Sequence, residues 1–158
     1  MDLIGGPEGI HVLNGIWPLA DVYESGPVYS AGVNMGKYDH ATFVLSEGAG
    51  GTGTTTITVE ACTDTGGTSP TAIGFRYRLM GTQDTWGAST AVESTGYATV
   101  AGANKMIAIE VDASDLTAAK PYVRVALTEL VDAVCTGSMV IICKEARYPQ
   151  AVPVTAIA

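Results

Sequence analysis

Apolar and polar residues alternate with a period of two in several short runs along this chain, as they do in β-strands that bury one face. In one run, Phe43 and Leu45 lie on one face and Val44 lies on the other. A second run, residues 56–61, alternates Ile, Val and Ala with Thr and Glu. A glycine- and threonine-rich segment joins the two runs. Together, residues 37–64 predict a β-hairpin with a long loop.

Later runs with the same alternation are also predicted to be strands: residues 73–80, 97–100, 107–112, 123–128 and 139–143. The last run is apolar on both faces, which indicates a strand in the middle of a sheet. The one helical signal is Ala113–Lys120, with Ser114 as an N-cap and Pro121 limiting the helix to one or two turns. Strands without regular strand–helix alternation predict an all-β fold, an antiparallel β-sandwich or barrel that is jelly-roll-like.

The ends of the chain differ in composition from this central part. Residues 1–36 are rich in Gly and Pro yet carry Trp17, Tyr23 and Tyr29, so they predict an extended N-terminal arm that lies on its own domain or on a neighbouring subunit. Residues 37–148 form the predicted sandwich domain. Residues 149–158 contain two prolines and predict an extended C-terminal tail.

The overall composition narrows the classes of function. The chain has 158 residues, of which 47% are hydrophobic and 15% charged, and its net charge is −8. Without a Lys/Arg cluster, this acidity argues against a nucleic-acid partner, because phosphate binding needs cations. The sequence contains no stretch of about 18 apolar residues, so it does not predict a membrane-spanning helix. The N-terminus does not resemble a secretory signal, and we therefore expect synthesis in the cytoplasm. The weakly charged surface favours packing against neighbours over a free monomer.

The side chains that usually carry chemistry are scattered. Cys62, Cys135 and Cys143 have no CxxC spacing and lie in apolar runs, so we expect buried free thiols and neither a metal nor a cofactor. Residues 48–53 match GxGxxG, but a strand follows where a dinucleotide site needs a helix. Asp64 begins the tripeptide DTG of aspartic proteases, but its neighbours predict a turn.

Pairs of polar residues give no stronger signal for catalysis. Asp39 and His40 are adjacent and so face opposite sides of a strand, and His11 has no acidic or thiol cluster around it. Arg76 and Arg78 share a face and are expected to pair with carboxylates or a subunit interface. The aromatic residues are spread along the chain, which favours packing over sugar stacking. We therefore do not predict an enzyme.

Short motifs at four places resemble those of small β-proteins of tailed bacteriophages and prophages that accompany the major capsid protein. They are the Tyr, Phe and Leu of residues 38–45, VEACTD at 59–64, KPYVRV at 120–125 and EARY at 145–148. The resemblance covers roughly residues 33–150. It implies a virion structural protein without catalytic residues, most specifically a head decoration (cement) protein on the capsid exterior. This chain differs in its longer N-terminal arm.

The expected partners are therefore the major capsid protein and neighbouring copies of the chain, as a dimer or trimer. Apolar residues of the arm and tail are the predicted contacts: Ile10, Val12, Ile16, Trp17, Tyr23, Tyr29, Tyr148, Val152 and Val154. Deleting residues 1–30 is expected to leave a soluble domain that no longer binds capsids. The alternatives are a neck or tail component of the virion, or a carbohydrate-binding or adhesion β-sandwich module.

Overall fold

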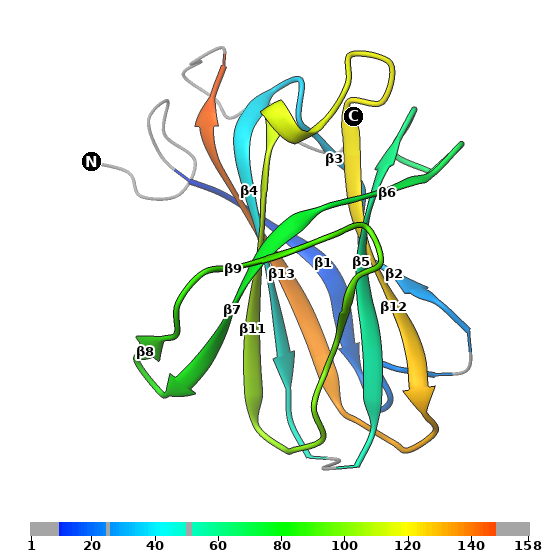
Figure 1. Cartoon of the computed structure of the whole chain (residues 1–158), viewed down its shortest axis with the longest axis vertical. Coiled ribbons are helices and arrows are strands. Elements are labelled where there is room, and N and C mark those ends of the chain that lie inside the picture. Colours follow the sequence, from blue (N-terminus) through cyan, green and yellow to red (C-terminus); the bar gives the residue numbers. More distant parts are fainter. Residues whose placement is uncertain (1–9, 25, 50–51, 148–158) are drawn as a thin grey trace.

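The computed structural model describes residues 10–24, 26–49 and 52–147 of the chain. Two antiparallel β-sheets pack face to face in these residues (Figure 1). The fold is an all-β sandwich, as the alternating runs predicted.

The larger sheet has seven strands, in the order β1-β13-β4-β11-β7-β8, with β9 also paired to β7. Its strands are β1 (His11–Leu19), β4 (Tyr38–Glu47), β7 (Phe75–Thr82), β8 (Thr85–Trp86), β9 (Thr90–Val92), β11 (Lys105–Asp112) and β13 (Gly137–Ala146). The run at 139–143, apolar on both faces, lies in β13 between β1 and β4, and its prediction as an inner strand is confirmed.

The smaller sheet has six strands, in the order β10-β5-β12-β2, with β6 paired to β5 and β3 paired to β12. Its strands are β2 (Val28–Tyr29), β3 (Val33–Asn34), β5 (Thr54–Cys62), β6 (Thr71–Ile73), β10 (Tyr97–Ala98) and β12 (Tyr122–Val131). The strand order places β13 between β1 and β4, and β12 between β5 and the pair β2 and β3. This is the connectivity of a jelly roll, in which the chain passes repeatedly from one sheet to the other.

The core fills the space between the sheets, and the period-two pattern correctly assigned its residues. Phe43 and Leu45 of β4 are fully buried, and so are Ile57 and Val59 of β5. In β13 the buried set is Met139, Ile141 and Cys143. All three cysteines are buried free thiols, as expected. Each strand thus contributes alternate side chains to one shared apolar layer.

The predicted hairpin over residues 37–64 is wrong, although both of its strands exist. β4 pairs with β11 and β13 in the larger sheet, whereas β5 pairs with β12 in the smaller one. The segment between them therefore crosses between the sheets instead of closing a hairpin. Alternation specifies which face of a strand is buried, and that face is the same whether the next strand lies beside it or across the core.

The predicted boundary at residue 36 is also corrected. β1 pairs with β13 over most of its length, and β2 and β3 pair with β12. Val22, Tyr23 and Val33 are fully buried in the core. From His11 onward, the proposed arm is therefore part of the sandwich, and deleting residues 1–30 would remove core side chains instead of releasing a folded domain.

The helical signal corresponds to a single short turn. A 3₁₀ helix, η1, spans Ala113–Asp115 between β11 and β12. Its N-cap is Asp112, whose backbone N–H donates to Asp115 Oδ2 at 3.1 Å, and not the expected Ser114. The predicted tail, residues 149–158, lies outside the described residues.

Candidate functional site

Four connections between the sheets meet at one end of the sandwich, the lower end in Figure 1. They join β1 to β2, β4 to β5, β10 to β11 and β12 to β13. Backbone hydrogen bonds tie these connections together: the Val22 N–H donates to Cys135 O at 2.7 Å, that of Thr136 to Ala49 O at 3.0 Å and that of Asn104 to Gly48 O at 2.8 Å. The loops therefore form one continuous surface.

Large apolar side chains are exposed on this surface. Of the eleven large hydrophobic residues exposed in the described part of the chain, six lie at or next to this end: Trp17, Leu19, Val100, Leu130, Val131 and Val134. Register places them there, because Leu19 pairs with Gly137 and Val131 pairs with Thr54. We call these six residues the apolar end. Apolar residues gathered on one surface are typical of sites that contact another molecule.

Carboxylates accompany the apolar end. Asp21, Glu129 and Asp132 lie at the same end, and within the described residues none of them forms an ion pair. Desolvation and then the charges of Asp132 and Asp21 raise the pKa of Glu129. Glu129 Oε1 is buried without a hydrogen-bond partner. The surface therefore combines apolar side chains with uncompensated negative charge.

A buried polar cluster supports this end from inside. The Glu47 side chain is 0% exposed, and Lys105 Nζ lies 3.0 Å from its Oε2. That contact is an ion pair without hydrogen-bond geometry, since Oε2 has no hydrogen-bond partner. The Tyr23 hydroxyl donates to Glu47 Oε1, and burial and this carboxylate raise the pKa of Tyr23. Because Glu47 ends β4, Lys105 begins β11 and Tyr23 belongs to the β1–β2 connection, the cluster fixes this connection to the ends of two strands.

The predicted contact residues divide into three groups. Ile16 and Tyr23 are 5% and 0% exposed, so they are core residues of this chain and are not available to a partner. Val12, Trp17 and Tyr29 are exposed and Ile10 is half-buried, but only Trp17 belongs to the apolar end. Tyr148, Val152 and Val154 lie outside the described residues.

Sequence reasoning missed most of the apolar end. A signal was present at residues 130–134, LVDAV, where apolar residues continue past the last alternating position of a strand. Leu19 ends β1 and Val100 follows β10, and neither gave such a signal, because each becomes part of the surface only where the connections meet.

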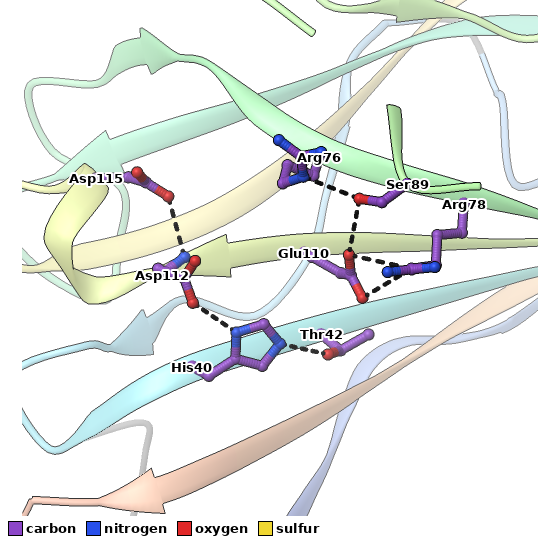
Figure 2. Close-up of polar contacts among 8 residues, drawn as sticks. All are labelled: His40, Thr42, Arg76, Arg78, Ser89, Glu110, Asp112 and Asp115. Carbon is purple, nitrogen blue, oxygen red and sulfur yellow. Dashed lines mark hydrogen bonds and ion pairs between the residues drawn. The ribbon is translucent and has the colours of Figure 1, made fainter. Parts of the chain in front are cut away.

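A polar network covers part of the outer face of the larger sheet (Figure 2). Arg78 Nε donates to Glu110 Oε1 and Oε2 at 3.3 and 3.4 Å, and Arg76 Nε donates to Ser89 Oγ at 2.9 Å. Ser89 Oγ donates in turn to Glu110 Oε2 at 3.4 Å. The expectation that Arg78 pairs with a local carboxylate is confirmed, whereas Arg76 bonds to a hydroxyl.

The same face brings a hydroxyl, an imidazole and a carboxylate into line (Figure 2). Thr42 Oγ1 lies 3.1 Å from His40 Nε2, and His40 Nδ1 lies 2.7 Å from Asp112 Oδ1. Hydrolases with a Ser-His-Asp triad use this order of groups, together with donors for the oxyanion that are often backbone N–H groups. In β4, however, residues 40–47 pair with β11 on one side and β13 on the other, so their backbone groups are used in the sheet. The arrangement orients polar side chains on a sheet surface that offers no backbone donors.

The remaining motifs are structural. Residues 48–53 lead into strand β5, as expected for a loop and not for a dinucleotide site. Asp64 lies in a turn, where its carboxylate accepts from the Thr68 N–H at 3.1 Å, and hydrogen bonds to Thr68 lower its pKa. Among the described residues, no three His, Cys, Asp or Glu side chains are grouped so that they could hold a metal ion. Within the same ranges, no helix is long and apolar enough to span a bilayer.

Comparison of the chain with protein-family models, with curated proteins and with solved structures finds no match. The geometry of the apolar end and the motifs of the sequence are therefore the basis for a functional assignment.

Proposed function

We propose that this protein is a virion structural protein of a tailed bacteriophage or prophage, a head decoration protein that binds the shell of major capsid protein and stabilises it. The observation that carries the proposal is the apolar end, where six exposed apolar side chains and three carboxylates without ion pairs gather on the connections between the sheets. The motif resemblance and the low content of charged residues support it as well.

The chemistry of the apolar end indicates the partner surface that would fit it. Apolar side chains on the partner would bury Leu130, Val131 and Val134, and each fully buried side chain of this size contributes about 1.5–3 kcal/mol. A lysine or arginine of the partner would offset the charges of Glu129 and Asp132. A second copy of this chain carries the same carboxylates at this end, so the capsid shell is a better match for it than self-association is. Contacts between neighbouring copies, as a dimer or trimer, would use other surfaces.

The mechanism is passive and follows from linkage. A protein that binds the closed shell better than loosened capsid subunits stabilises the shell by mass action. The jelly roll serves as a rigid body, and the Tyr23–Glu47–Lys105 cluster holds the loops of the apolar end in place. On this proposal the protein is made in the bacterial cytoplasm and functions on the exterior of the capsid.

Co-sedimentation of the purified protein with DNA-free heads, assembled from the major capsid protein of the same virus, tests the proposal. Val134→Asp places a charge in the apolar end, where the Val134 side chain is 64% exposed in the free protein. We expect it to weaken binding at least about tenfold, which corresponds to about 1.4 kcal/mol. The matched control is Val140→Asp on the outer face of the larger sheet, which should bind as the parent does.

Both variants should keep the melting temperature of the parent, because both positions are exposed. Failure of the parent protein to sediment with heads, or equal binding by Val134→Asp and the parent, would contradict the proposal. The number of copies per particle separates a head decoration protein, present in many copies, from a neck or tail component, present in few.

A further inference from the structure

A groove of about 370 Å³ lies on the outer face of the larger sheet, away from the apolar end. Its floor is apolar and consists of Val44, Ala108 and Ile142. Trp86 of β8 stands at one wall, and Arg78 and Glu110 form a polar rim. The volume falls within the range of about 300–1,000 Å³ that small-molecule sites occupy.

The polar rim is held in position before any ligand binds (Figure 2). The Glu110 carboxylate accepts from Arg78 Nε and from Ser89 Oγ, and Arg78 Nη1 also donates to Gly87 O at 3.4 Å. The side chains of Arg78 and Glu110 are 39% and 24% exposed, so both can still be reached from solvent. Because the two charges offset each other, the rim offers fixed donors and acceptors without a strong net charge.

The backbone beneath the groove has little to offer a ligand. β4 is paired on both sides, with β11 and β13, and β11 is paired with β4 and β7. An extended peptide binds a sheet mainly through main-chain hydrogen bonds at an open edge, and the floor of this groove is not an edge. A ligand here must therefore bring hydroxyl groups to side chains and an apolar surface to the floor and Trp86.

We propose that this groove binds a glycan, with one pyranose ring as the unit recognised. A pyranose has an apolar C–H face that can stack on an indole ring, whose π-electron face is partly negative. The hydroxyl groups at the edge of the pyranose can donate to the Glu110 carboxylate and accept from the Arg78 guanidinium. Both side-chain groups are planar and can bind two neighbouring hydroxyl groups at once. Thr42, the cross-strand neighbour of Glu110, and Lys144 also line the groove and add a hydroxyl and an ammonium group. This site is independent of the capsid contact proposed above.

Fluorescence titration tests the site directly, because the chain has only two tryptophans. In the variant Trp17→Phe, the remaining tryptophan signal comes from Trp86 alone. The probes are the methyl glycosides of glucose, galactose, mannose and N-acetylglucosamine. We expect at least one of them to shift the Trp86 fluorescence with a dissociation constant of about 1 mM. Adenosine, which is planar and aromatic, serves as the comparison ligand.

The chain offers a matched pair of variants for the rim. Glu110→Gln should weaken the response at least about tenfold, because a charge-assisted hydrogen bond to the ligand is lost. Glu60→Gln removes a carboxylate that is also paired with an arginine, Arg124 at 2.8 Å, but lies on the smaller sheet, and it should leave the response unchanged. Thr42→Val, at the position paired with Glu110 on β4, tests the groove if Glu110→Gln does not fold.

Each result bears on the proposal. A saturable response to a glycoside that is lost in Glu110→Gln or Thr42→Val and kept in Glu60→Gln supports it. No response to any of the glycosides, a response to adenosine alone, or a response that both Glu110→Gln and Thr42→Val retain would overturn it. None of these results depends on capsid binding, so the outcome is separate from that of the sedimentation test.

Discussion

Replacing Lys105 by Met leaves the carboxylate of Glu47 buried beneath the apolar end without its cation. Lys105 Nζ lies 3.0 Å from Glu47 Oε2, and the lysine side chain is 26% exposed whereas that of Glu47 is 0% exposed. The methionine keeps most of the apolar stem of the lysine, so the change removes charge with little loss of volume. The Tyr23 hydroxyl still donates to the other carboxylate oxygen.

The size of the effect follows from this geometry. Removing one partner of a buried ion pair costs about 3–5 kcal/mol, because the remaining charge stays desolvated. Since Lys105 is partly exposed and Tyr23 remains, we expect the lower end, about 2–3 kcal/mol. In a chain of this length each kcal/mol lowers the melting temperature by about 2–4 °C, so Lys105→Met should melt about 4–12 °C below the parent.

The difference in melting temperature between variant and parent is measured by thermal unfolding followed by circular dichroism at pH 7.

A double variant completes the test. Glu47→Gln combined with Lys105→Met removes the buried charge altogether and should recover part of the stability that Lys105→Met loses. If Lys105→Met melts within about 2 °C of the parent at pH 7, which corresponds to less than about 1 kcal/mol, then burial of the Glu47 charge is refuted.

Three further predictions concern the core and the turns. Burial raises the pKa of Cys143 to about 12, so iodoacetamide should not label this thiol in the native protein at about pH 8.5 but should label it in urea. The unfolded thiol has a pKa of about 8.5 and loses its proton first, so the stability of the native state falls as pH rises above that value. The melting temperature should therefore also fall between about pH 9 and 11. Gly96→Ala should cost about 1–3 kcal/mol in denaturant unfolding, since φ is +88° at Gly96 and a Cβ there would lie 2.5 Å from Ile57 O. An unchanged unfolding midpoint would contradict this. Deleting residues 1–30 should abolish the cooperative unfolding transition, because Val22 and Tyr23 belong to the core, and a truncated protein that still melts cooperatively would refute that placement.

Local alternation was sufficient for most of the long strands, but not for β1, β2 and β3, whose glycine- and proline-rich sequence predicted an extended arm instead. Each run predicted from period-two patterning overlaps a strand of the structure, and Phe43, Leu45, Ile57 and Val59 all face the core as expected. The physical reason is that successive residues of a strand face opposite sides, so burial of one face is recorded directly in the order of residues. The turn at Asp64 was also predictable, because its signals lie within a few residues of one another.

The sequence by itself therefore determined an all-β chain, the position of most of its long strands after residue 37 and the face that those strands bury. Only the tertiary structure decided which strands pair, and it placed β4 and β5 in different sheets and joined β1 to β13. It also brought Tyr23, Glu47 and Lys105 together, and gathered Leu19, Val100 and residues 130–134 at one end. These groupings join residues that are distant along the chain, and nothing in a local pattern distinguishes a neighbour in the same sheet from one across the core.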